Sequence, residues 1–425
     1  MKIQKGKSLI DQCDSRGFYG GKFGGNFVAE TAIKPIQDLS KLFEKLRRDK
    51  KFLKLRDYYF KNYLGGETPF FPLSNLSRHL GGAQIWCKDV SAIHGDAHKA
   101  YHATVNALIC KASGKKYIAG DTGAGMFGRN LAMAARELKL SCRIFMGTID
   151  IKRQAPNVKF MREAGAEIIP VNTGSKTLVD AVSECMRYYV SNCDTTHLAV
   201  GSAIGANVFL KICAWSTAQI SKELKQQLKR EFGKIPKLKL VNVIGGGSSA
   251  AGFFSEFIHY PKKYVELIGV EAKYAAPLTT NAKLAILHGA AQYCLTDKDG
   301  QIKETHSISA GLDYPGVSPL HCFLKDTGRA RYTSASDEQA LAAFKLVTQL
   351  ESSIKPSLEP AHCLHEVIRI APKLNKNEIS KWNNEYRKSL SESIGKLSYA
   401  VIHTDLYTLD SILKNPTISF NGIEP

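Results

Sequence analysis

The sequence predicts an α/β protein with two three-layer domains and largely parallel sheets. Strand-like and helix-like segments alternate through the middle of the chain, and this alternation is typical of parallel strands covered by helices on both faces. A chain of 425 residues is long enough for two domains. Three consecutive glycines also separate a strand-like run from a helix-like run, at the kind of position where α/β sheets carry ligand sites.

The segments behind this prediction are short and closely spaced. The expected strands are residues 116–119, 142–146, 167–171 and 238–244. The expected helices are residues 131–138 and 157–164, with another that begins near residue 250. A charged helical stretch at residues 217–232 predicts the boundary between a domain of residues 1–216 and one of residues 217–425. From residue 355 onward the alternation becomes unclear.

The formal net charge of +19 is concentrated in two helix-like stretches, residues 41–61 and 222–239. A basic surface attracts nucleic acid and anionic membranes. Acidic residues are interspersed in both stretches, however, and no recognition motif combines basic with aromatic residues. We therefore interpret them as solvated helix faces and expect neither nucleic acid nor a membrane as a partner.

The ten cysteines are scattered and form no CxxC pair. This usage predicts reduced thiols rather than disulfides or a metal site. The basic start, residues 1–7, is not followed by the apolar segment of a secretory signal. We therefore expect a cytoplasmic protein.

The segment IGGGSS, residues 244–249, contains the three glycines. Backbone N–H groups in such a turn can converge on one anion, and the positive end of the following helix assists them. The segment is neither a Walker loop nor a GxGxxG fingerprint. It therefore fits a phosphate cradle, and equally a plain tight turn.

The segment HGDAHK, residues 94–99, places Lys99 just before an apolar helical run. A lysine together with a separate phosphate cradle suggests pyridoxal phosphate, which needs a lysine for its Schiff base and an anchor for its phosphate. The alternative is a solvated lysine at the start of a helix.

Six segments occur in the same order in one known family. They are RGFYGGKFGGNFVAET (residues 16–31), HGDAHK (94–99), DTGAG (121–125), RQAPNV (153–158), GGGSS (245–249) and SISAGLDYP (307–315). The corresponding family motifs are FGGxxVPET, HTGAHK, ETGAG, RQSPNV, GGGSN and SISAGLDFP. The chain thus resembles the tryptophan synthase beta family, which consists of fold-type II pyridoxal-phosphate enzymes.

The resemblance implies pyridoxal 5'-phosphate as cofactor, a serine-like amino-acid substrate, a homodimer and an alpha-type partner subunit. It also implies that a mobile subdomain, about residues 114–201, closes over the substrate. A segment of about residues 63–97 would cross into the C-terminal domain.

For cofactor binding, the resemblance implies that Lys99 forms the Schiff base and moves the proton at the substrate α-carbon. His98 would lie near the phosphate, although a core imidazole is an equal alternative. The residues that would hold the phosphate are Ser202, Gly245, Gly246, Gly247, Ser248 and Ser249. Ser249 stands where the family has asparagine, and its hydroxyl can still bond a phosphate.

For substrate binding, Asp121 stands at the family's acid–base glutamate and is one methylene shorter. A helix N-cap is the alternative role for Asp121. The backbone of Thr122, Gly123, Ala124 and Gly125 would bind the substrate carboxylate. Met126 and Phe127 replace the family's glutamine and histidine.

Three further groups of residues can be compared with the site residues of the family. Arg153 and Asp313 resemble a pair that closes the lid, with a surface pair as the alternative. Leu287 and His288 stand near the aromatic residues that line the family's indole tunnel. A monovalent cation would bind the backbone of Gly245, Tyr314 and Gly316.

The C-terminal part departs most from the family. Its LSGRGDKD segment is missing, and residues 401–407 bridge the deletion. Thr404 is the best substitute for the serine that faces the pyridine nitrogen. Glu359 is kept as a cofactor neighbour, but Pro360 replaces a serine.

Three functions remain open at this point. The first is tryptophan synthesis from serine and indole. The second is a pyridoxal-phosphate reaction with another substrate, such as β-elimination, serine or threonine deamination, or the use of another nucleophile. The third is a degenerate homologue with a binding or regulatory role, since fold and cofactor do not fix function.

Overall fold

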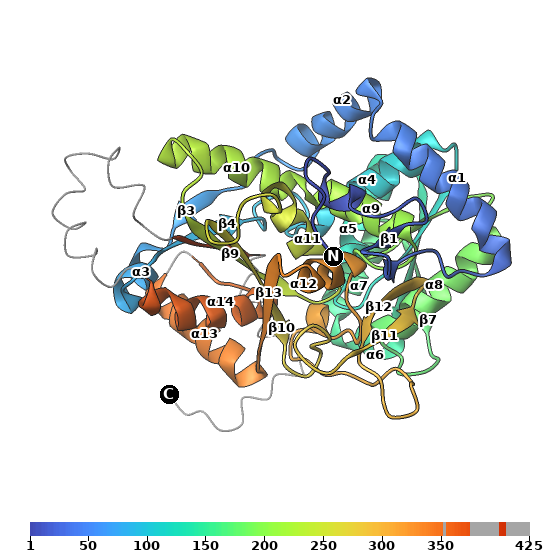
Figure 1. The fold of residues 1–425 in the computed structure, drawn as a ribbon. Coiled ribbons are helices and arrows are strands. Elements are labelled where there is room, and N and C mark those ends of the chain that lie inside the picture. The colour runs from blue at the N-terminus through green and yellow to red at the C-terminus, as the bar shows by residue number, and fades with distance from the viewer. Residues whose placement is uncertain (352–353, 375–398, 405–425) are drawn as a thin grey trace.

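The computed structural model describes residues 1–351, 354–374 and 399–404. Two parallel sheets and one small antiparallel sheet form the molecule (Figure 1). No helix within these ranges is long and apolar enough to cross a membrane. All ten cysteines are free thiols.

The larger sheet has six strands in the order β13-β10-β9-β14-β4-β3. Neighbouring strands are parallel except for β3, which is antiparallel to β4. The bounds are β3 Phe70–Pro72, β4 Gln84–Asp89, β9 Leu238–Ile244, β10 Val265–Ala272, β13 Ala330–Ala335 and β14 Tyr399–Thr404. Early, middle and late parts of the chain therefore share one sheet.

Side chains that alternate along β9 build two different cores. Val241 packs in one cluster with Val347 and Val367, whereas Leu240 packs in another with Leu224 and Phe253. The helices of the first face are α3 (Ser74–Leu80), α13 (Asp337–Leu350) and α14 (Leu358–Ile370). Those of the second are α10 (Gln219–Phe232) and α11 (Ser248–Phe254), with α12 (Pro319–Asp326) beside β13. Burial of the sheet on both faces explains why its central strand β9 is mostly apolar.

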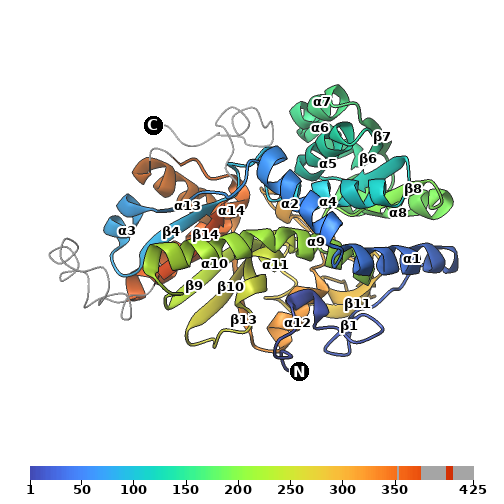
Figure 2. The same ribbon diagram turned by 90° about the horizontal axis from the view of Figure 1, so that it is seen from above.

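The smaller parallel sheet has the order β7-β6-β5-β8. Its strands are β5 (Tyr117–Asp121), β6 (Ser141–Gly147), β7 (Glu167–Val171) and β8 (Thr196–Ala199). Figure 2 shows this sheet and its helices as a group at one end of the molecule. The helices are α4 (Lys99–Ala112), α5 (Met126–Glu137), α6 (Thr148–Arg153), α7 (Ala155–Glu163) and α8 (Leu178–Asn192).

A third, antiparallel sheet is a feature that the sequence analysis missed. Its order is β1-β2-β12-β11, with β1 Phe18–Tyr19, β2 Phe23–Gly24, β11 Lys283–Leu287 and β12 Ala290–Cys294. The remaining helices are α1 (Glu30–Leu46), α2 (Lys50–Tyr58) and α9 (Asn207–Thr217). Because β1 and β2 have two residues each, no periodicity could predict them.

The predicted strands agree closely with the observed ones, and three helical predictions need correction. α5 begins at Met126 instead of residue 131. The stretch at 41–61 is divided between α1, α2 and a π-helical turn. In the stretch at 222–239, helix α10 ends at Phe232 and is followed by Gly233, whose φ is 68°. The rest of this stretch leads into β9.

The predicted domain boundary at residue 217 falls between α9 and α10, which lie end to end (Figure 2). α10 buries seven residues and so packs as a core helix, not as a linker. Residues 358–370, in the polar C-terminal region, form the largely buried helix α14. The division into two domains stays a prediction.

A buried ion pair connects β4 with α10. The Lys88 ammonium is fully buried and donates to Glu223 Oε2 at 2.9 Å and to the Thr68 carbonyl at 2.8 Å. Glu223 Oε2 also accepts the Thr68 N–H at 3.0 Å. Burial lowers the pKa of Lys88, while the charge of Glu223 opposes this shift.

Glu223→Gln should lower the free energy of unfolding by about 3 kcal/mol, because it leaves a buried ammonium without its counter-charge. The control is Glu163→Gln, since Glu163 pairs with Lys159 at 3.8 Å on the surface and such pairs contribute less than about 1 kcal/mol. Urea unfolding of both variants measures the difference. Equal effects would contradict the assignment of a buried structural pair.

Candidate active site

The main cavity collects segments that follow the carboxyl ends of strands in both parallel sheets. Residues 121–127 follow β5, Gly201 and Ser202 follow β8, and residues 245–249 follow β9. The start of α4, at His98 and Lys99, completes this side. Ligand sites of open parallel sheets lie at this end of the strands.

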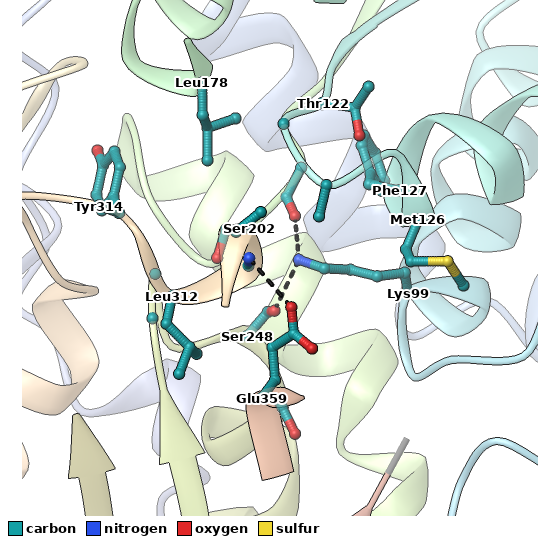
Figure 3. A pocket seen from close by; sticks show the side chains of 18 of the residues that line it. Lys99, Thr122, Met126, Phe127, Leu178, Ser202, Ser248, Leu312, Tyr314 and Glu359 are labelled. Atoms are coloured by element: carbon teal, nitrogen blue, oxygen red, sulfur yellow. Dashed lines mark hydrogen bonds between the residues drawn. The ribbon is translucent and has the colours of Figure 1, made fainter. Parts of the chain in front are cut away.

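Lys99, the first residue of α4, extends into the cavity (Figure 3). Its Nζ donates to the Gly201 carbonyl at 2.5 Å and to Ser248 Oγ at 3.1 Å. His98 Nε2 lies 2.9 Å from the same Ser248 Oγ. The Lys99 amine therefore connects the loop after β8 with the loop after β9, and it is not a solvated helix-start cation.

The glycines after β9 leave no room for side chains. A Cβ on Gly245 would lie 2.4 Å from the Gly311 carbonyl oxygen, and one on Gly246 would lie 2.4 Å from Ser202 Oγ. Gly247 has φ +94°, which disfavours other residues. Ser248 then begins α11. The bare backbone and the helix start together form a concave surface suited to an anion.

The cradle has a rigid support behind Gly247. His321 Nε2 lies 2.9 Å from the Gly247 carbonyl, and His321 Nδ1 lies 3.0 Å from the Tyr332 hydroxyl. A carbonyl only accepts, so Nε2 carries the proton and Tyr332 donates to Nδ1. Ser249 lines the cavity and accepts from Asn242 Nδ2 at 3.0 Å.

Asp121 is the last residue of β5 and is almost fully buried. Its Oδ1 accepts the Gly201 N–H at 3.1 Å. Burial raises the pKa of Asp121 to about 6, and the Gly201 hydrogen bond and the Lys99 charge oppose this shift. The alternative role as a helix N-cap is wrong, because Gly125 caps α5.

The loop from Thr122 to Gly125 lines the cavity at the N-terminus of α5. Asn157 Nδ2 donates to the Ala124 carbonyl at 2.9 Å and so holds the loop against α7. Met126 and Phe127, in the first turn of α5, form an apolar wall (Figure 3). Phe127 stacks on buried His102, with ring centroids 4.7 Å apart.

Arg153 and Asp313 do not line the cavity, and no ion pair joins them among the described residues. Arg153 instead lies 3.9 Å from Asp150. Burial raises the pKa of Asp150 to about 6; the Arg153 charge lowers it and the Asp313 charge raises it. Asp313 Oδ1 is buried and has no hydrogen-bond partner in the described part of the chain. Closure of a lid by Arg153 and Asp313 stays a prediction.

Glu359 lines the cavity and its Oε1 accepts the Gly311 N–H at 3.2 Å (Figure 3). Thr404 is the last residue of β14, whose backbone runs between β9 and β4. The side chain of Thr404 and residues 405–407 lie outside the described part. The role of Thr404 stays a prediction.

The wall opposite Met126 and Phe127 contains Leu178 and Val182 of α8, Leu312 and Tyr314. Of these residues the sequence analysis named only Tyr314, and only for its backbone. Apolar residues at helical spacing in residues 178–192 would have indicated α8. The role of the Gly201 backbone had no signal beyond a glycine after a strand.

Comparison with known proteins gives a consistent result. Residues 61–357 match the family described as pyridoxal-phosphate dependent enzyme. The tryptophan synthase beta chains of Chromobacterium violaceum and Acinetobacter calcoaceticus are 40% and 41% identical over 374 residues. That alignment covers 86% of this chain and 92% and 91% of those proteins.

Two solved structures are similar in fold. Diaminopropionate ammonia lyase from Escherichia coli has a TM-score of 0.63 at 19% identity, covering 95% of this chain and 94% of that one. The threonine deaminase of T.th. has a TM-score of 0.57 at 17% identity, with 86% and 96% covered. At these identities the likeness concerns the fold alone.

As the pH rises from 4 to 7, the Asp121→Asn variant should become more stable relative to the wild type. The folded-state pKa of Asp121, about 6, lies above its ordinary value of 3.8. In the wild type, the proton on Asp121 therefore stabilises the folded state fully below about pH 4. This contribution to the free energy of unfolding, at most about 3 kcal/mol, is lost as the pH rises through 6.

Urea unfolding of the wild type and the Asp121→Asn variant at pH 4, 5, 6 and 7 measures this difference. Asp150→Asn serves as the positive control for the pH dependence, because the pKa of Asp150 is raised to a similar value and Asp150 lies outside the cavity lining. A difference between Asp121→Asn and wild type that does not change with pH would contradict the buried, protonatable Asp121.

Proposed function

The chain belongs to the pyridoxal-phosphate dependent enzymes, as a member of the tryptophan synthase beta family, and we propose that it forms tryptophan from serine and indole. The observation that carries the proposal is one cavity that contains Lys99, Asp121, the loop at residues 122–125 and the glycine cradle at residues 245–247. These are the amine, the acid–base group and the two anion sites that the reaction requires.

The cavity fits pyridoxal phosphate on two grounds. The cradle offers backbone alone, since any side chain at Gly245 or Gly246 would collide with Gly311 or Ser202. The Lys99 amine lies beside the cradle residue Ser248. We therefore assign the phosphate to Ser202 and the cradle, with His98 and Ser249 in support, and covalent attachment to Lys99. Glu359 would lie beside the cofactor.

Pyridoxal phosphate supplies an electron sink for the substrate α-carbon, which allows a β-substituent to leave and another to replace it. Lys99 would remove and return the proton at the α-carbon. The N–H groups of residues 122–125 would hold the substrate carboxylate at the start of α5. Asp121 would donate a proton to the departing serine hydroxyl.

Asp121 is one of the residues in which this site departs from its family. Its carboxylate is one methylene shorter than the family's glutamate, a retreat of about 1.5 Å. It is also held by the Gly201 N–H. A misplacement of this size can reduce a rate about a hundredfold, and we therefore expect weak tryptophan formation.

Four finer predictions belong to this proposal. We propose that the protein forms a homodimer, that an alpha-type subunit binds it, and that it works in the cytoplasm. We also propose a monovalent cation at the backbone of Gly245, Tyr314 and Gly316. The name of the relatives, tryptophan synthase beta chain, supports the second of these.

Asp121→Glu should raise kcat/KM for tryptophan formation by roughly ten- to a hundredfold, since the added methylene extends the carboxylate into the cavity. Asp121→Asn is the matched control and should lose about a hundredfold or more. The measurement follows tryptophan, pyruvate and ammonia in mixtures of serine and indole.

The three products separate the alternatives. Wild-type activity equal to that of Asp121→Glu would contradict an altered acid–base site. Pyruvate and ammonia without tryptophan, in both proteins, would replace the proposal with β-elimination of serine. If the protein is saturated with cofactor but forms no product from serine and indole, a binding or regulatory role would be favoured.

A further inference from the structure

His288 lies in the turn between β11 and β12, outside the cavity lining, with an unusual backbone conformation. Its φ is +51°, a left-handed value that is rare for a residue other than glycine. Such a conformation persists where the surroundings hold the residue, and it often accompanies a functional role.

The ring of His288 joins three separate elements. Nδ1 lies 2.8 Å from the Tyr314 hydroxyl, and Nε2 lies 3.2 Å from the Val179 carbonyl and 3.3 Å from Ser183 Oγ. Val179 and Ser183 belong to α8. The turn at His288 is thereby tied both to α8 and to Tyr314.

These partners fix the direction of each hydrogen bond. Burial lowers the pKa of His288 to about 4, so the ring is neutral near pH 7. The Val179 carbonyl can only accept, so Nε2 carries the ring proton and Nδ1 is an acceptor. Tyr314 must therefore donate its single hydroxyl hydrogen to His288.

This bond turns the polar end of Tyr314 away from the cavity. Tyr314 lines the cavity beside Leu178 and Leu312, and Figure 3 shows its hydroxyl pointing away from Lys99. Val182, on the same helix that holds His288, also lines this wall. The cavity therefore meets ring carbons and aliphatic side chains on this side.

We propose that His288 is a specificity-determining residue, which keeps this wall apolar by holding the Tyr314 hydroxyl outside the cavity and so selects an apolar ring nucleophile over a hydroxylated one. The proposal rests on the proposed function for the use of a ring nucleophile. Gln292 also bonds the Tyr314 hydroxyl, but as a donor. Without His288 the hydroxyl hydrogen would therefore lose its acceptor, which is unfavourable for a buried group, and Tyr314 would turn to another acceptor in the cavity.

The test measures dissociation constants of indole and of 4-, 5-, 6- and 7-hydroxyindole for the cofactor-loaded protein without serine. The wild type should prefer indole to every hydroxyindole. His288→Asn, chosen because asparagine tolerates a left-handed backbone, should reduce that preference about tenfold for at least one hydroxyindole. If His288→Asn does not fold, His288→Gly adopts the left-handed backbone freely and removes the same bonds.

Two further variants separate specificity from structure. Adding Tyr314→Phe to His288→Asn removes the released hydroxyl and should return the preference to within about threefold of wild type. His259→Asn is the control, because His259 is exposed and its Nε2 bonds the Lys7 carbonyl at 2.8 Å outside the cavity lining. His259→Asn should leave the preference for indole unchanged.

An unchanged preference in the folded His288 variant would overturn the inference. So would an equal loss of affinity for all five ligands, which would indicate a structural role alone, and so would a wild type that does not bind indole. Because binding is measured without turnover, absence of tryptophan formation would count against the proposed function and not against the role of His288.

Discussion

The backbone of Gly201 holds the side chains of Lys99 and Asp121 in place in the cavity. Its N–H donates to Asp121, and its carbonyl accepts from Lys99. A Cβ here would lie 2.8 Å from Asp121 Oδ2 and 3.0 Å from the Phe127 ring, so only glycine fits. One residue after β8 thus sets the distance between the end of β5 and the start of α4, and the arrangement of the site depends on it.

Strands and ligand loops were predictable because their signals are local. The runs at residues 167–171 and 238–244 coincide with β7 and β9. β9 is central and largely buried, and its run is mostly apolar for that reason. The glycines at 245–247 fitted a phosphate cradle and a plain tight turn equally, and the family resemblance favoured the cradle. Lys99 and Asp121 followed from the resemblance, and the structure brings both to one cavity.

The structural features that could not be predicted from the sequence depend on contacts between distant residues. The small antiparallel sheet pairs Gly24 with Ala291, and no local pattern records such a pairing. The pairing of Arg153 with Asp150 is local to α6, whereas a pairing with Asp313 would join two distant parts of the chain. His288 acquires its role only because α8 and Tyr314 approach it from different parts of the chain.

Covalent attachment of pyridoxal phosphate to Lys99 is the central claim, and one measurement tests it directly. The cofactor-loaded protein is reduced with borohydride and digested, and its peptides are mapped by mass spectrometry, with Lys99→Ala as the matched control. We predict a cofactor adduct on the peptide that contains Lys99, absent from the control. An adduct on another lysine, or none on a protein saturated with cofactor, would contradict the assignment of this cavity.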